Sequence, residues 1–229
     1  MPDFLQYPDR DVLMENIAED VADQLGEAIA LRGVATLAVP GGTTPAPFLK
    51  LLSHAEIDWS KVRVMLTDER FVPETSDRSN TRLLRETLIQ NVASVATLIP
   101  FYREADTPED VLDELSEAIS AALPIDVCVL GMGADMHTAS LFPEADRLDE
   151  GLDQNGAAVL LPMRAPGAPE PRLTLTAAVL RGAGHIHVLI TGEGKKSALE
   201  AAMTEGPTSE APIRVILNAP TNVDIHYAD

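Results

Sequence analysis

An aspartate and a histidine, Asp135 and His137, stand two residues apart just after a short apolar run, residues 125–130. The run predicts a buried β-strand, and Gly131 and Gly133 follow it directly. Glycine lets a ligand approach the backbone closely, and open α/β sheets bind ligands at the carboxyl ends of their strands. Histidine is the side chain best suited to take up a proton near neutral pH. We therefore predict a general base at this edge, His137, with a carboxylate beside it.

A second group of charged residues follows another predicted strand, residues 62–67, and consists of Asp68, Glu69 and Arg70. If the two strands are parallel, these charges lie at the same edge of the sheet as His137. The plainer interpretation is a solvated turn with a local ion pair. The sequence leaves both interpretations open.

Two glycine-containing turns suit an anion. The predicted strand 34–39 ends in Pro40-Gly41-Gly42-Thr43-Thr44-Pro45, and a helical pattern follows. Strand, glycine turn, hydroxyl residues and helix start form an arrangement that cradles phosphate with backbone N–H groups. The turn matches neither the Walker loop nor the dinucleotide fingerprint, and glycine could also serve only its geometry. The second turn, residues 192–196, contains Lys195.

The elements that must position these residues alternate along the chain. Apolar spacing predicts helices at residues 11–32 (capped by Asp11 and ended by Gly33), after residue 45, and at 83–89, 108–123 and 197–203. Apolar or alternating runs predict strands at 34–39, 62–67, 97–101, 125–130, 157–163 and 185–191, with short strands at 213–217 and 223–226. Strands followed by helices indicate right-handed crossovers and a mainly parallel sheet flanked by helices, hence one α/β domain over residues 1–229.

Composition excludes several classes of partner. Asp and Glu total 36 against 17 Lys and Arg, and the formal charge of −19 disfavours nucleic acid and anionic membranes. No apolar run approaches a membrane span of about 18 residues, and residues 1–10 do not form a signal peptide. The single cysteine, Cys128, is expected in the core of a cytoplasmic protein. The histidines lack metal-ligand spacing, so no metal is expected.

Four blocks of sequence together resemble the 6-phosphogluconolactonase family, within the group that includes glucosamine-6-phosphate isomerase/deaminase. The blocks span most of the chain and comprise Gly41 to Pro45; Thr67 to Arg70 with Val72-Pro73, Asp77 and Ser79-Asn80; Leu130 to Gly133 with His137 to Pro143; and Arg172-Leu173-Thr174 with Gly192 to Lys195. Arginine after Asp-Glu and the His-Thr-Ala-Ser-Leu-Phe-Pro run favour the lactonase branch. The chain departs from the family at Pro40, where serine is frequent, and at Met136, where glycine can adopt a positive φ or leave room for the sugar.

The resemblance implies a Rossmann-like fold of the NagB/RpiA/CoA transferase-like type and hydrolysis of 6-phospho-D-glucono-1,5-lactone to 6-phosphogluconate, in the oxidative pentose phosphate pathway. No metal or cofactor is implied. His137 would activate water, and Asp135 or Asp68 would orient the imidazole or hold sugar hydroxyls. Arg70 would hold phosphate or stabilise developing negative charge. The phosphate would be bound by Gly41, Gly42, Thr43, Thr44, Arg172 and Lys195.

Two other functions stay open at this point. An amino-sugar-phosphate isomerase/deaminase would use Asp68 to abstract a proton from carbon and would release ammonia. A non-catalytic sugar-phosphate sensor would bind the same ligand without turnover. Such sensors carry a DNA-binding helix-turn-helix, and the formal charge of −19 argues against one here. The sequence predicts a small-molecule phosphosugar lactone as substrate and leaves a monomer or a homodimer open.

Overall fold

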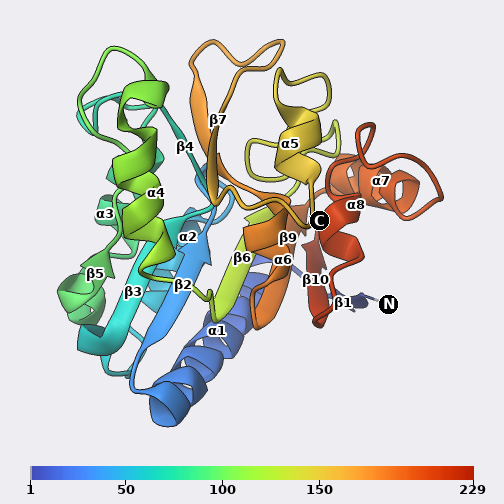
Figure 1. Cartoon of the computed structure of the whole chain (residues 1–229). Helices are drawn as coiled ribbons and strands as arrows, with labels where there is room; N and C mark the ends of the chain where they lie inside the picture. Colours follow the sequence, from blue (N-terminus) through green and yellow to red (C-terminus); the bar gives the residue numbers. More distant parts are fainter. Residues whose placement is uncertain (1) are drawn as a thin grey trace.

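The computed structural model describes residues 2–229 and is built around a parallel sheet (Figure 1). Its seven strands run in the order β1-β10-β9-β6-β2-β3-β5, and every pairing between neighbours is parallel. In chain order they are β1 (Asp3–Gln6), β2 (Ala35–Val39), β3 (Val62–Leu66), β5 (Thr97–Leu98), β6 (Val127–Gly131), β9 (His185–Thr191) and β10 (Val223–Ala228).

A small antiparallel sheet stands at one end of the main sheet. It consists of β4 (Asp68–Arg70), β8 (Arg172–Leu175) and β7 (Leu160–Met163), in that order. Figure 1 shows it above the carboxyl ends of the main strands. Only Thr67 separates β3 from β4, and its N–H donates to the carbonyl of Val39 at 2.9 Å. The small sheet therefore begins directly at the edge where the site was predicted.

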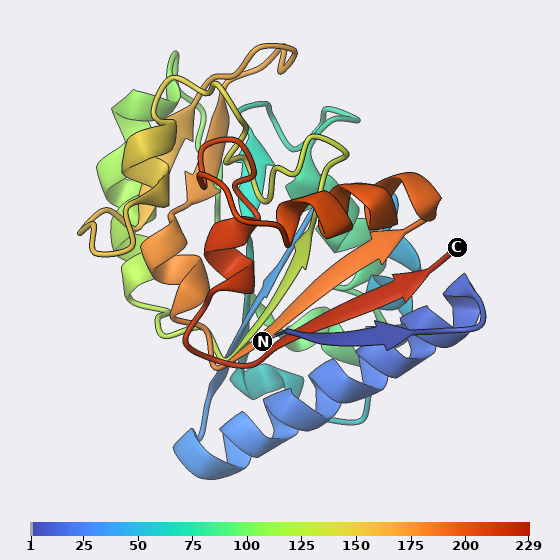
Figure 2. The same cartoon turned by 90° about the vertical axis from the view of Figure 1, so that its right-hand side faces the viewer.

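Helices cover both faces of the main sheet, and Figure 2 shows the long helix α1 on one side of the strands and α7 on the other. The α-helices are α1 (Arg10–Arg32), α2 (Ala46–Leu52), α3 (Asn80–Thr87), α4 (Leu112–Ser120), α5 (Leu148–Leu152), α6 (Ala177–Arg181), α7 (Glu193–Ala202) and α8 (Arg214–Leu217); short 3-10 turns are η1 (Trp59–Lys61), η2 (Asn91–Val95) and η3 (Pro108–Val111). Within residues 2–229, no helix combines the length and apolar character needed to cross a membrane.

The core explains why the strand runs are continuously apolar. All five residues of β2 are buried, and so are the first four of β6, because a parallel sheet is covered on both faces. Cys128 lies in β6 with no exposed surface, and burial raises the pKa of its thiol to about 12. This cysteine is a core residue, as predicted, and carries no reactive thiolate.

The strand order places a crevice at the centre of the sheet. β2 lies between β3, which follows it in the chain, and β6, which is reached only after the chain has passed through β5 and α4. The loops after β2 and β6 therefore leave the sheet in opposite directions, which is the position where doubly wound sheets bind ligands.

Several sequence predictions differ from the structure. The side chain of Asp9, not Asp11, caps α1, while Gly33 ends the helix at φ 78° as predicted. The apolar run at 213–217 is the short helix α8 rather than a strand, because a short buried run has no period that separates the two. Helix α7 begins at Glu193, four residues before the predicted start at 197. Strand β1 was not predicted, because its two apolar residues, Phe4 and Leu5, are too few to form an apolar or alternating run.

Candidate active site

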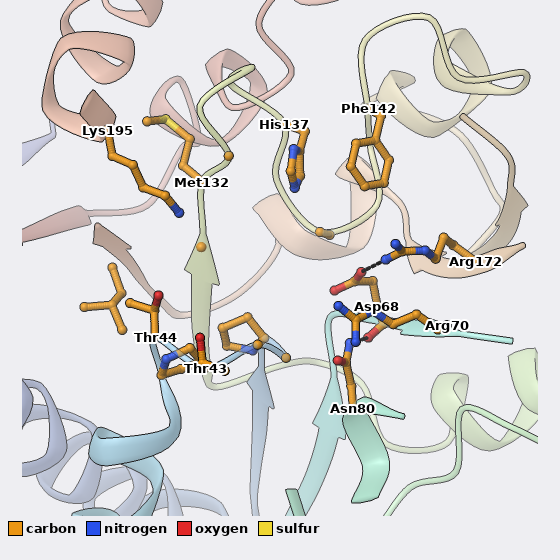
Figure 3. Close-up of a pocket in the computed structure, with 18 residues that line it drawn as sticks. Thr43, Thr44, Asp68, Arg70, Asn80, Met132, His137, Phe142, Arg172 and Lys195 are labelled. Atoms are coloured by element: carbon orange, nitrogen blue, oxygen red, sulfur yellow. Dashed lines mark hydrogen bonds and ion pairs between the residues drawn. The ribbon is translucent and has the colours of Figure 1, made fainter. Parts of the chain in front are cut away.

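A pocket of about 310 Å³ opens at the central crevice (Figure 3). Its walls come from the loop after β2, strand β4, the start of α3, the loop after β6, strand β8 and the first turn of α7. The lining residues are Pro40, Gly41, Gly42, Thr43, Thr44, Pro45, Asp68, Arg70, Asn80, Gly131, Met132, Gly133, His137, Ala139, Phe142, Arg172, Leu189 and Lys195. Segments from the whole length of the chain therefore meet at one site.

His137 faces this pocket with its ring held from behind. Nδ1 of His137 lies 2.5 Å from Oδ1 of Asp135, and the same oxygen accepts from the backbone N–H of His137 at 3.3 Å. Because a carboxylate accepts hydrogen bonds, Nδ1 carries the proton and Nε2 keeps a free lone pair. The ring also packs against Phe142, with centroids 4.2 Å apart. An imidazole held in this way is suited to accept a proton from water at Nε2.

The loop of residues 133–137 fits this pair because Gly133 has no side chain. A Cβ at Gly133 would lie 2.3 Å from Oδ1 of Asp135 and from Nδ1 of His137. The N–H of Gly133 donates to the carbonyl of His137 at 2.9 Å, and the N–H of Met136 donates to the carbonyl of Gly133 at 3.0 Å. The glycine predicted to allow close approach of a ligand therefore also makes room for the side chains of Asp135 and His137.

Met136 sits in this turn with φ 63°, in the left-handed region that favours glycine. The conformation expected of a glycine at this position is thus present, although the residue is methionine. The N–H of Ile213 donates to the Met136 carbonyl at 3.0 Å, and the Met136 side chain packs against the core. These contacts hold the residue in a conformation that costs about 1–2 kcal/mol for an L-amino acid.

Asp68 belongs to a different hydrogen-bond network. Its Oδ2 accepts from Oγ of Ser140 at 2.6 Å and lies 3.9 Å from a guanidinium nitrogen of Arg172. Asp135, not Asp68, is therefore the carboxylate that contacts His137. The interpretation of residues 68–70 as a solvated turn is wrong, because Asp68 and Glu69 lie in strand β4 and are buried.

Two arginines have unused donors in the wall beside Asp68. Among the described residues, Nε of Arg70 and Nε of Arg172 are the buried side-chain nitrogen or oxygen atoms without a hydrogen-bond partner. One terminal nitrogen of Arg70 donates to the carbonyl of Arg78 at 2.6 Å. Burial lowers the pKa of Arg172, which Asp68 partly offsets. Buried donors without partners are rare in proteins, and here both belong to residues that line the pocket.

The glycine turn and Lys195 form the other side of the pocket. Gly42 adopts φ 95°, a backbone conformation that explains why a glycine is needed at this position. Lys195 is half buried in the first turn of α7; burial lowers the pKa of its ammonium group, and the charge of Asp135 raises it. Figure 3 shows Lys195 and Thr44 on one side of the pocket, with Asp68 and Arg172 across from them.

Nine of the ten predicted site residues line the pocket, and the tenth, Asp135, stands behind His137. The sequence did not single out Asn80, Phe142 or Ser140, which contact the predicted residues. All three lie inside the blocks that carry the family resemblance, so only that resemblance pointed to them. No cluster of three or more His, Cys, Asp or Glu residues suited to a metal ion occurs within residues 2–229.

Comparison with known proteins gives a consistent result. The family model described as glucosamine-6-phosphate isomerases/6-phosphogluconolactonase matches residues 8–226. A 6-phosphogluconolactonase of Mesorhizobium japonicum is 48% identical over 97% of this chain and 93% of its own length. One from Rhizobium meliloti is 46% identical over 94% of both chains. The crystal structure of a 6-phosphogluconolactonase from Shewanella baltica superposes with a TM-score of 0.97 at 36% identity, covering 100% of this chain and 98% of that one. The chain therefore belongs to the glucosamine-6-phosphate isomerase/6-phosphogluconolactonase family.

Proposed function

We propose that this chain is a 6-phosphogluconolactonase, a single α/β domain that hydrolyses 6-phospho-D-glucono-1,5-lactone to 6-phospho-D-gluconate in the oxidative pentose phosphate pathway. One observation carries the proposal beyond family membership. Nδ1 of His137 is held 2.5 Å from Asp135, which leaves Nε2 free as a base in a pocket that also contains a phosphate-type glycine turn. Relatives at 46–48% identity bear this enzyme's name.

The substrate is charged at one end and reactive at the other, and the pocket has a matching pair of ends. The Gly41–Thr44 turn and Lys195 supply backbone N–H groups, hydroxyls and an ammonium group for the phosphate dianion. Arg172 lies 3.9 Å from the carboxylate of Asp68, and a carboxylate repels a phosphate dianion. This contact favours a place for Arg172 at the ester end of the substrate, rather than the phosphate position expected from the family resemblance. The lactone ring then lies between the two ends, beside His137.

The chemistry requires one proton to move twice. Nε2 of His137 takes a proton from water as the water oxygen bonds to the lactone carbonyl carbon. Asp135 stabilises the imidazolium that results, because it accepts from Nδ1. When the tetrahedral intermediate collapses, the bond from the carbonyl carbon to the ring oxygen breaks, and the ring oxygen takes the proton from Nε2. The product is the open-chain acid, and His137 is neutral again.

Negative charge develops on the carbonyl oxygen during this reaction and needs donors. The unpartnered Nε atoms of Arg70 and Arg172 lie in the wall next to Asp68 and are suited to this oxygen or to the product carboxylate. Together with Lys195 they place three cations in the pocket of a chain whose formal charge is −19. Such local focusing attracts an anionic substrate despite the overall charge.

A lactonase assay on freshly generated substrate, corrected for spontaneous hydrolysis, tests the proposal. We expect acceleration that depends on enzyme concentration, without added metal. Glucosamine 6-phosphate is the matched second substrate, and no ammonia should be released from it. Ammonia release without lactone hydrolysis would assign the isomerase/deaminase reaction instead. Binding of 6-phosphogluconate without faster hydrolysis would assign a sensor.

A further inference from the structure

Glu69 is the residue of strand β4 that faces away from the pocket. Successive side chains of a strand point to opposite faces, and Asp68 and Arg70 both line the pocket. Glu69, between them, points into the protein and has no exposed surface. A fully buried carboxylate needs hydrogen bonds to offset the loss of its hydration.

The Glu69 carboxylate receives five hydrogen bonds. Oε1 accepts from the backbone N–H groups of Arg70 and Asn80, each at 2.8 Å. Oε2 accepts from the N–H of Thr81 at 2.7 Å, from Oγ1 of Thr81 at 2.8 Å and from Oγ of Ser79 at 3.2 Å. Each carboxylate oxygen is therefore held by donors from β4 or from the first turn of α3.

The set of partners fits an ionised carboxylate. Three of the five donors are backbone N–H groups, which can only donate, and each carboxylate oxygen accepts from at least one of them. Burial raises the pKa of Glu69 above its usual value, and the hydrogen bonds from Asn80, Thr81 and Arg70 offset part of this increase. No apolar side chain of similar size could hold these donors, because it has no acceptor.

The contacts of Glu69 join the two ends of the loop at residues 71–78. Arg70 precedes the loop and Ser79 follows it as the N-cap of α3. Inside the loop, the carbonyl of Arg78 accepts from the guanidinium of Arg70 at 2.6 Å. Without the Glu69 carboxylate, the start of α3 and strand β4 would lose their main polar connection.

Asn80 extends the connection to the phosphate side of the pocket. Its Nδ2 donates to the backbone carbonyl of Asp68 at 3.0 Å. Its side chain also fills the space over Gly41 so closely that a Cβ at Gly41 would lie 2.0 Å from Cγ of Asn80. The first residue of α3 thus spaces the glycine turn from Asp68, and Glu69 fixes that residue.

We propose that Glu69 is a positioning residue of the active site, whose ionised carboxylate fixes Asp68, Arg70 and Asn80 relative to the Gly41 turn without touching substrate. The proposal deepens the proposed lactonase function and rests on that function only for its kinetic readout. It predicts that loss of the charge disturbs both ends of the pocket while the rest of the fold persists.

Glu69→Gln tests it, because glutamine keeps the size but turns two acceptor oxygens into one acceptor and one donor. Isothermal titration with 6-phosphogluconate distinguishes a distorted pocket from a loss of folded protein. The stoichiometry gives the fraction of folded sites, and Kd gives the affinity of those sites. We expect at least a tenfold increase in Kd at unchanged stoichiometry, with at least a tenfold loss of kcat/KM. Wild-type Kd and wild-type turnover per binding site would overturn the proposal.

A matched control lies at the other end of the same helix. Thr87→Val removes a buried hydroxyl that donates to the Leu83 carbonyl at 2.7 Å, and Thr87 does not line the pocket. We expect it to lower Tm while leaving Kd and kcat within about twofold of wild type. Equal losses of affinity in Thr87→Val and Glu69→Gln would show that only helix stability matters, and would also overturn the proposal.

A milder pair of variants covers the case in which Glu69→Gln does not fold. Thr81→Val removes one of the five hydrogen bonds, and Thr81→Ser retains the hydroxyl. We expect Kd to rise about threefold in Thr81→Val and to stay at the wild-type value in Thr81→Ser. A wild-type Kd in Thr81→Val would contradict the role of Glu69. If wild-type protein fails to hydrolyse the lactone, the proposed function is wrong, whereas titration with 6-phosphogluconate or inorganic phosphate still decides the role of Glu69.

Discussion

Asp135 and His137 form a hydrogen-bonded pair, Oδ1 to Nδ1 at 2.5 Å, on a turn that Gly133 leaves free of side-chain atoms. Asp68, the other carboxylate that the sequence offered for this role, contacts Ser140 and Arg172 instead. The two carboxylates therefore have separate tasks. Asp135 holds the imidazole of His137, and Asp68 contacts Ser140 and Arg172 in the wall opposite Lys195.

Asp135→Asn should lower kcat by about 100-fold, within the range that a positioned general base contributes. An amide at this position no longer stabilises an imidazolium and can donate to Nδ1, which puts the proton on Nε2 and removes the base. Steady-state kinetics give kcat, and Asp149→Asn, an exposed acid in α5 outside the pocket, is the control. A kcat within threefold of wild type would refute the role of Asp135.

Lys195→Met should raise KM by about 10- to 100-fold with a smaller effect on kcat, because a hydrogen bond to a charged group contributes about 1.5–3 kcal/mol. The adjacent Lys196 is the matched control, since its ammonium lies over the Tyr227 ring and it does not line the pocket. Lys196→Met should leave KM within about twofold. Equal KM values for Lys195→Met and wild type would remove Lys195 from the phosphate end.

Met136→Gly should leave the free energy of unfolding within about 1 kcal/mol of wild type. Relief of the positive φ gains about 1–2 kcal/mol, while the flexibility of glycine in the unfolded chain costs about 0.5–1 kcal/mol and some packing is lost. Met136→Ala loses the packing but keeps the strain, so it should be the less stable variant in urea unfolding. A more stable alanine variant would show that the backbone at Met136 is not strained.

The buried histidines should make stability depend on pH. His187 and His226 hydrogen-bond to each other at 2.9 Å, between Gln24 and Tyr7, with Asp224 4.0 Å from His187. Burial lowers the pKa of His187 to about 3 and that of His226 to about 4. Below pH 6.5 the unfolded chain takes up protons that the folded chain excludes, so the free energy of unfolding falls by about 1.4 kcal/mol per pH unit for each histidine.

Urea unfolding between pH 5 and pH 7.5 measures this slope. His226→Gln keeps a polar group at the site and should make the slope shallower by about 1.4 kcal/mol per pH unit. His54→Gln alters an exposed histidine and should leave the slope unchanged. If His226→Gln has the same slope as wild type, the buried pair does not control the acid sensitivity of the fold.

Most of the candidate site could be predicted from the sequence, because the site residues directly follow predicted strands. Strand runs such as 125–130 were readable from apolar character alone, and the polar residues after them had to meet at one edge of a parallel sheet. The hydrogen-bond partners were not readable in this way. Whether Asp68 or Asp135 reaches His137 depends on the turn at Gly133. The burial of Glu69 depends on its pairing with β8, which lies more than 100 residues further along the chain.

The errors in predicting the fold from the sequence have a similar cause. Residues 68–70 carry three charges in a row, which is typical of a solvated turn, yet pairing with β8 buries two of them. Strand β1 is exposed at the sheet edge and is specified by its parallel pairing with β10, not by its own residues. Long-range pairing overrides local pattern in both cases.

The most direct test of His137 as the general base is the turnover of His137→Ala, measured against 6-phosphogluconate binding by the same variant. We predict a loss of at least about 100-fold in kcat, with Kd for 6-phosphogluconate within threefold of wild type, because the glycine turn, Lys195 and the arginines are untouched. A kcat within threefold of wild type would contradict base catalysis by His137.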